Sequence, residues 1–278
     1  MVDQSGNATP FATTGTARAS ALPQSGNFPA RGVPIIVGIN RIGVWSLYVK
    51  EVRRFIKVQT QTIWAPAVTT LLFLVIFTVA LGRQGREVLG VPFASFVAPG
   101  LIVMAMMQNS FANSSFSFLS GKIQGTIIDL LMPPLSEGEL LAGIVLAAVT
   151  RAVLVGCTVA AAMLLWPGVG LTVAHAWAIV WFGLMGATML ALLGLATSIW
   201  AEKFDHSAAI TNFVVAPLSL LSGTFYVISG FRFGFLGASD IGNSNAALVQ
   251  SAAGLLLFNL ALGYATYRLL KSGWKLKS

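Results

Sequence analysis

The stretch GKIQGTIIDLLMPPLSEGELLAG, residues 121–143, lies between two long apolar segments and decides how the chain is divided. Lys122 and Asp129 flank an apolar patch made of Ile127, Ile128, Leu130, Leu131 and Met132. Pro133-Pro134 ends any helix there. Ser136, with Glu139 three residues later, has the spacing of a capping box that starts a new helix. The pattern predicts a short amphipathic helix at a membrane surface and a helix that returns into the bilayer. An ordinary loop between helices fits the spacing equally well.

The composition of the chain is that of an integral membrane protein. Of its 278 residues, 56% are hydrophobic and 9% are charged, and the mean hydropathy is +0.80. A soluble domain carries about 25% charged residues. The net charge of +8 would suggest nucleic acid as the partner of a soluble protein, but here an excess of basic residues on one side of a membrane explains it. We therefore expect a lipid bilayer around the chain and no nucleic-acid partner.

The first part of the chain divides into a tail and an amphipathic segment. Residues 1–33 are rich in Ala, Thr, Ser, Gly and Pro, which predicts a flexible cytoplasmic tail; because Arg18 and Arg31 oppose only Asp3, an organelle transit peptide is the alternative. Residues 34–62 are predicted to form an amphipathic interfacial helix. Within them, aromatic and aliphatic residues alternate with basic ones, which is typical of a helix in the headgroup plane.

Residues 63–278 contain six apolar segments, each of which we expect to be a transmembrane helix. They are Ile63–Leu81, Phe93–Phe118, Leu140–Trp166, Ala174–Trp200, Ala208–Tyr226 and Ala246–Leu270. The shortest segments have 19 residues, and such a helix is about 28 Å long, enough for the hydrocarbon core. Helices are expected because lipid offers no partner to unpaired backbone groups. The predicted fold is therefore an all-α membrane protein of six transmembrane helices preceded by a cytoplasmic amphipathic helix.

The distribution of basic residues predicts the orientation in the membrane. If the N-terminus is cytoplasmic, 13 of the 17 Lys and Arg residues fall on the cytoplasmic side. Three, Arg83, Arg86 and Arg232, fall in outer loops, and Arg151 lies within a span. Because loops rich in Lys and Arg stay inside, both termini and the loop at residues 121–143 are predicted to be cytoplasmic.

Two features inside the predicted spans have a possible role in transport. Asn109, Asn113 and Ser117 are spaced by four and share one face of the second span. Such residues either join helices by hydrogen bonds or line a polar translocation path. Arg151, within the third span, is the fourth candidate for this path, because a cation inside a membrane is a functional hypothesis by default. Its partner could be a backbone carbonyl, a group at a subunit interface or an anionic substrate.

The sequence gives no indication of a catalytic or metal site. His175 and His206 lie at opposite ends of the fourth predicted span, so they cannot share a metal ion. Gly121-Lys122 lacks the other residues of a phosphate-binding loop. We therefore expect no catalytic residue, metal or cofactor in this chain. The predicted spans also contain no paired carboxylates, which a proton-coupled carrier would usually need.

Three stretches of the sequence carry a resemblance to a known family. They are GTIIDLLMPPLSEGELLAG at 125–143, FVVAPLSLLSGTFY at 213–226 and YVISGFRFGFLG at 226–237. With the six spans and the amphipathic helix, they resemble the permease subunits of ABC-2 type exporters, which are found in the bacterial inner membrane. The resemblance implies a homodimer, or half of a heterodimer, working with a separate ABC ATPase subunit that binds ATP and magnesium.

The resemblance also implies roles for particular residues. In such permeases a surface helix between spans two and three docks on the ATPase, and the amphipathic helix before span one touches it as well. Carried onto this chain, the docking residues are Ile127, Ile128, Asp129, Leu130 and Leu131, with Glu51, Arg53 and Arg54 at the edge. The path would lie between spans one, two and five of the two subunits.

The substrate is not determined by the resemblance. A polysaccharide or lipid-linked glycan, which needs aromatic and polar lining residues, and an amphipathic drug-like compound, which needs a closed apolar cavity, are both compatible with it. A secondary transporter without an ATPase partner is the alternative function. In one respect the chain departs from the family, because Gly223-Thr224-Phe225-Tyr226 runs directly into Val227, where family members carry re-entrant half-helices.

Overall fold

The computed structural model describes residues 38–81, 87–88, 90–131, 133–166, 169–215, 223–237 and 245–273. The predicted tail, residues 1–33, lies outside the described residues, and the chain from Gly38 onward forms one compact unit. Its helices are α1 (Arg41–Lys57), η1 (Thr60–Trp64), α2 (Ala65–Leu81), α3 (Phe93–Ile123), α4 (Ile127–Leu131), α5 (Glu137–Leu164), α6 (Ala176–Trp200), α7 (Phe204–Ile210), η3 (Thr211–Val215), α9 (Gly223–Leu236) and α10 (Asn245–Ser272).

Five of the described helices are long and apolar enough to cross a membrane, as the composition of the chain predicts. They are Thr60–Val79, Phe93–Ile123, Glu137–Leu164, Ala176–Trp200 and Ala247–Ser272. They correspond to the first four predicted spans and the sixth. The prediction of a mostly helical membrane protein is therefore confirmed, with five single helices of spanning length.

The structure describes the predicted fifth span, Ala208–Tyr226, only in part. Its beginning forms the end of α7 and then the π-helix η3, and its last four residues form the first turn of α9. Residues 216–222 lie outside the described residues. The predicted end at Tyr226 is wrong, since α9 continues for ten residues to Leu236.

Packing explains why α9 continues. Val227 is fully buried, and a Cβ atom on Gly186 of α6 would lie 2.6 Å from its side chain. Arg232, assigned above to an outer loop, lies on α9 with its guanidinium carbon 3.8 Å from the ring centroid of Phe96.

Small residues let α6 approach its neighbours closely. Two small residues of α6, Ala187 and Ala191, are fully buried, and the Ala187 carbonyl accepts a 2.7 Å hydrogen bond from Ser110 of α3. One turn after Ala191, a Cβ atom on Gly194 would lie 2.6 Å from the backbone oxygen of Phe111. The α3–α6 pair therefore forms the most extensive helix contact in the described residues.

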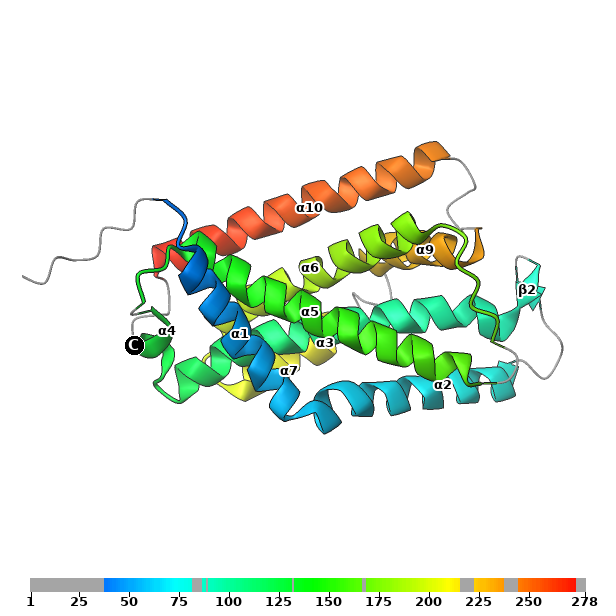
Figure 1. Ribbon diagram of the computed structural model, residues 1–278, viewed down its shortest axis with the longest axis horizontal. Helices are drawn as coiled ribbons and strands as arrows, with labels where there is room; N and C mark the ends of the chain where they lie inside the picture. The colour runs from blue at the N-terminus through cyan, green and yellow to red at the C-terminus, as the bar shows by residue number, and fades with distance from the viewer. Residues whose placement is uncertain are drawn as a thin grey trace, which may run out of the picture. The chain divides into compact units, whose positions relative to one another are not determined.

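The two ends of the bundle hold different parts of the chain (Figure 1). One end, called the α4 end from here on, holds α4, the start of α1 and the end of α10. The opposite end holds a short antiparallel pair of strands that the sequence did not predict, β1 (Glu87–Val88) and β2 (Val91–Pro92). There the Gly234 carbonyl of α9 accepts hydrogen bonds from the backbone amides of Ala174 (2.9 Å) and His175 (2.7 Å), just before α6.

Candidate functional site

The helix α4 has one face packed into the bundle and one face exposed at the α4 end. Ile127 and Leu130 are each 8% exposed and belong to an apolar cluster with residues of α1, α3, α5, α6 and α10. Ile128 is 61% exposed, and Asp129 is also exposed. The side chain of Leu131 lies outside the described residues. Of the predicted docking residues on α4, Ile128 and Asp129 therefore face outward, whereas Ile127 and Leu130 hold the helix in place.

Polar contacts fix the segment that leads into α4. Gly125 has a φ of +71°, a left-handed conformation that glycine adopts readily, and it turns the chain between α3 and α4. The Lys122 ammonium group donates 3.0 Å hydrogen bonds to the carbonyls of Ile199 and Ala201. These carbonyls lie at the C-terminal end of α6, where a cation is favoured by the helix dipole.

The capping box predicted from the sequence is present at the start of α5 and has an additional partner. Ser136 Oγ accepts from the Glu139 amide at 3.4 Å, and Glu139 Oε2 accepts from the Ser136 amide at 2.8 Å. The other carboxylate oxygen of Glu139 accepts from the Asn40 backbone amide at 2.5 Å, and the Asn40 side chain caps α1 by accepting from the Gly43 amide. Glu139 thus joins the starts of α1 and α5. This contact could not be predicted from local spacing, because Asn40 and Glu139 are 99 positions apart.

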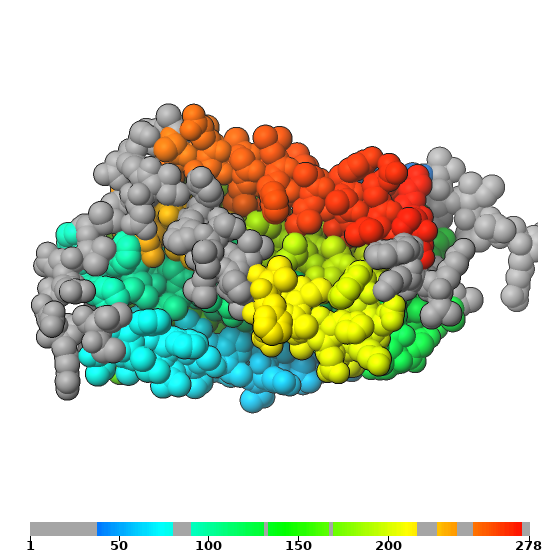
Figure 2. Space-filling view, turned by 180° about the vertical axis from the view of Figure 1, so that it is seen from behind, coloured from blue at the N-terminus to red at the C-terminus, as the bar shows by residue number. Residues whose placement is uncertain are grey.

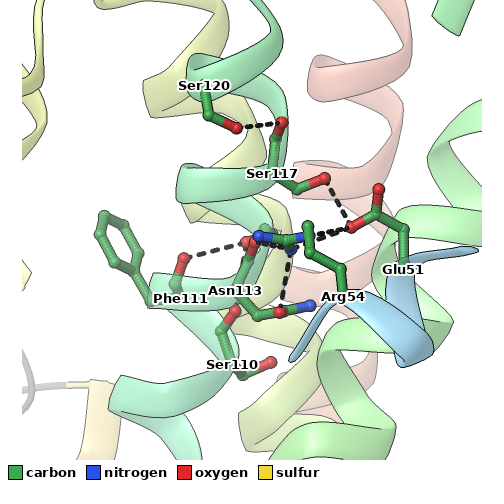
Figure 3. Close-up of polar contacts among 8 residues, drawn as sticks. Glu51, Arg54, Ser110, Phe111, Asn113, Ser117 and Ser120 are labelled. Atoms are coloured by element: carbon green, nitrogen blue, oxygen red, sulfur yellow. Dashed lines mark hydrogen bonds and ion pairs between the residues drawn. The ribbon is translucent and has the colours of Figure 1, made fainter. Parts of the chain in front are cut away.

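The residues of α1 that were predicted to lie at the docking edge face different directions. Glu51 is 3% exposed, and its carboxylate forms a 2.9 Å ion pair with Arg54 and accepts a 2.7 Å hydrogen bond from Ser117 of α3. Arg54 also donates to the carbonyl and the side-chain oxygen of Asn113, at 3.2 and 3.1 Å (Figure 3). Arg53 is exposed. Glu51 and Arg54 are therefore turned toward α3, and Arg53 alone of the three is on the outer surface.

The four predicted path residues take part in helix contacts. Asn113 and Ser117 bond to the side chains of α1, as described above. Arg151 of α5 donates a 2.9 Å hydrogen bond to Asn109 Oδ1, so its partner is an amide oxygen on α3. Two buried nitrogens in this group, Asn113 Nδ2 and Arg151 Nε, have no hydrogen-bond partner in the described part of the chain. These contacts join α1, α3 and α5, and a role of the four residues in transport stays a prediction.

A cavity of about 600 Å³ lies between α3 and the α7–η3 segment. Its polar lining consists of Gln108, Asn109, Ser115, Ser207, Thr211 and Asn212. Phe116 and Phe204 stack at 5.8 Å between ring centroids, within the same lining. Figure 2 shows α7 and η3, in yellow, on the face of the bundle between α2 and α10. Asn109 is the one predicted path residue that lines this cavity.

The described residues offer no group of three His, Cys, Asp or Glu side chains that could hold a metal ion. His175 stacks on Phe233 at 4.5 Å, and His206 lies 5.6 Å from Trp200, in each case between ring centroids. Both histidines therefore contact aromatic rings at opposite ends of α6.

A family model described as ABC-2 type transporter matches residues 43–240, which is most of the chain. The chain belongs to the ABC-2 type transporter family. It is similar to the inner membrane transport permease YadH of Escherichia coli K12, with 31% identity over 258 residues that include 85% of this chain and 98% of YadH. The same figures hold for YadH of Shigella flexneri.

Family and relative together establish a membrane transport permease. The five apolar helices agree with a multi-pass protein of the inner membrane. The alignment with YadH contains gaps in this chain. Because 85% of 278 residues is about 236, some of the 258 aligned positions have no residue from this chain.

Proposed function

We propose that this ABC-2 permease is the membrane subunit of an ATP-driven exporter and works with a separate ABC ATPase. In this proposal the α4 end is cytoplasmic, ATP and magnesium are bound by the ATPase, and two permease copies form the translocation path. Membership in the family supports the ATPase partner. The excess of Lys and Arg in the segments expected to be cytoplasmic supports the orientation.

The observation that carries the proposal is the division of α4 into two faces. Ile128 is an apolar side chain left 61% exposed at the tip of the bundle, beside the exposed Asp129. A large exposed apolar side chain with a polar rim is typical of a protein interface. Arg53, exposed on α1, is the further contact that we propose.

The packing of α4 supports transmission of a movement from the ATPase to the spans. Ile127 and Leu130 pack with Phe118 of α3 and Leu140 of α5 in one apolar cluster. Packed elements move as units because close-packed interiors deform little. A shift of α4 would therefore move α3 and α5, and Glu139 would carry the start of α1 with them. ATP binding would drive transport by favouring one of two arrangements of these helices.

We further propose that the part of the chain from α7 to α9 makes the remaining crossing of the membrane, which is the fifth along the sequence. The end of α6 lies at the α4 end, where Lys122 binds its last carbonyls. The following segment begins beside α3 with the Ser115–Ser207 hydrogen bond and ends at the opposite end of the bundle, where Gly234 bonds to Ala174.

The test is co-purification of the ATPase with tagged permease from native membranes. In wild type we expect a stoichiometric partner that hydrolyses ATP. Ile128→Glu should reduce its recovery at least tenfold, since a charge at the centre of an apolar interface loses more than about 1.4 kcal/mol. Leu165→Glu is the matched control, because Leu165 is 87% exposed but lies just after α5 at the opposite end.

Normal recovery of the ATPase with Ile128→Glu would exclude α4 as the docking helix. A permease that purifies without any ATPase, and that transports in vesicles supplied with a proton gradient but no ATP, would favour a secondary transporter instead.

A further inference from the structure

The helix α10 carries a stripe of exposed residues that is apolar along its length and basic at its end. Leu257, Leu260 and Tyr264 are 67%, 61% and 62% exposed, and Arg268 and Lys271 are also exposed. Residues three or four positions apart share one face of a helix, so these five side chains lie in line. They are called the α10 stripe from here on. Figure 2 shows α10, in orange and red, at the edge of the bundle.

The basic end of the α10 stripe borders a surface cavity of about 470 Å³. The cavity is lined by Tyr264, Tyr267, Arg268, Lys271 and Ser272. The Arg268 guanidinium donates a 3.1 Å hydrogen bond to the Tyr264 hydroxyl, which leaves most of its five N–H groups available. Neither Arg268 nor Lys271 forms an ion pair with a carboxylate in the part of the chain that the structure describes. The cavity therefore presents two uncompensated cations beside two phenolic hydroxyls.

The order of these groups along α10 matches the layers of a membrane. The helix is long and apolar enough to span the bilayer, and it is the least buried of the five candidate spans. Tyrosine is enriched where the hydrocarbon meets the head groups. Arg268 and Lys271 each follow a tyrosine, Tyr264 or Tyr267, by four residues, which is about 6 Å along the axis. The two cations are therefore expected in the layer of the lipid phosphates.

We propose that the α10 stripe binds one anionic phospholipid of the surrounding bilayer, with its phosphate in the cavity and one acyl chain along the helix. The phosphate oxygens would accept charge-assisted hydrogen bonds from Arg268 and Lys271, and the acyl chain would lie on Leu257 and Leu260. A zwitterionic lipid carries its own cation beside the phosphate, so a lipid of net negative charge is favoured. This binding requires that α10 spans the membrane, and it does not depend on the proposed ATPase.

Two other occupants fit the α10 stripe less well. A second permease copy would meet this face across a twofold axis, which brings the same patch of both copies together. Arg268 would then face Arg268, and like charges placed opposite each other are unfavourable. A soluble subunit could reach the basic end of the stripe, but Leu260 and Leu257 lie about 12 and 16 Å before Arg268 along the helix, within the hydrocarbon.

The test measures lipid binding to the purified full-length permease by native mass spectrometry, without any ATPase. The probes are phosphatidylglycerol and phosphatidylcholine with identical acyl chains. We expect saturable binding of phosphatidylglycerol and a clear preference for it over phosphatidylcholine. Arg268→Gln and Lys271→Gln should each weaken phosphatidylglycerol binding about fivefold, as expected for one basic residue near a membrane surface. Both variants should leave phosphatidylcholine binding unchanged.

Lys50→Gln is the matched control, because it removes the same charge from an exposed position on α1 that does not line the cavity. Equal binding of the two lipids would overturn the proposal, as would equal losses in Lys50→Gln and the two α10 variants. Competition by soluble glycerol phosphate would reveal a site for free phosphate esters and overturn the lipid assignment. Loss of a co-purifying ATPase in the α10 variants, with phosphatidylglycerol binding intact, would make the cavity a protein interface and overturn it as well.

Discussion

Neutralising Glu51 tests whether the ion pair between α1 and α3 stabilises the bundle. Glu51 is 3% exposed, and its carboxylate lies 2.9 Å from the Arg54 guanidinium. The variant Glu51→Gln has nearly the same shape and keeps an oxygen that can accept from Ser117. It therefore removes the negative charge and little else, and it leaves Arg54 without a counter-ion.

The magnitude follows from the burial of both partners. Breaking a fully buried pair by removing one charge destabilises a protein by about 3–5 kcal/mol. The Arg54 side chain is 29% exposed, so water screens part of its charge and we expect about 2 kcal/mol. For a domain of this size that corresponds to a fall in Tm of roughly 4–8 °C.

The assay is thermal unfolding of the purified permease in detergent. The double variant Glu51→Gln/Arg54→Gln, which has no unpaired charge, should regain at least half of the lost Tm. Glu137→Gln, an exposed acid at the start of α5, is the control and should shift the Tm by about 1 °C or less. A Tm of Glu51→Gln that stays within about 1 °C of wild type would refute this reasoning, as would a double variant that loses the sum of both single effects.

Two further predictions concern the contacts that hold α6 and α1. Gly194→Ala should lower the Tm by an amount equivalent to about 1–3 kcal/mol, because the new Cβ atom would lie 2.6 Å from the Phe111 backbone oxygen and force α3 and α6 apart. The control Gly254→Ala meets no atom within 4 Å and should leave the Tm unchanged or raise it; equal losses in both variants would contradict the account. Glu139→Gln should speed hydrogen exchange at the start of α1, since the amide has one acceptor oxygen where the carboxylate has two. Glu137→Gln should not change it, and unchanged exchange in Glu139→Gln would show that Asn40 is held by other contacts.

The positions of most membrane helices could be predicted from the sequence because lipid offers the backbone no hydrogen-bond partner. A backbone in hydrocarbon must satisfy its own hydrogen bonds, so a long apolar segment becomes a helix whatever its neighbours are. The predicted start of the second span at Phe93 and the predicted end of the fourth at Trp200 agree with α3 and α6. The capping box at Ser136 could be predicted for a related reason, because its two bonds join residues within one turn.

The sequence did not determine which face of each helix is buried. In a soluble protein an apolar side chain points inward, but lipid is as apolar as the protein interior, so hydrophobicity no longer separates the two. Ile127 and Ile128 are identical neighbours, yet the first is 8% exposed and the second 61%. Likewise Glu51 belongs to an amphipathic pattern that predicts an outward carboxylate, and it is buried against α3.

The continuation of α9 to Leu236 and the pairing of distant polar residues were also decided by tertiary structure. The residues from Ala208 to Tyr226 are apolar enough to predict one span that ends at Tyr226. In the structure α9 continues to Leu236, because Val227 packs closely against Gly186 of α6. Arg151 donates a hydrogen bond to Asn109, which is 42 positions away in the sequence, and the Asn40 amide donates one to Glu139, which is 99 positions away. Composition and local spacing therefore determined that this protein is a bundle of membrane helices, since each helix satisfies its own backbone. Contacts between the helices decided which side chains remain available for a partner or a ligand.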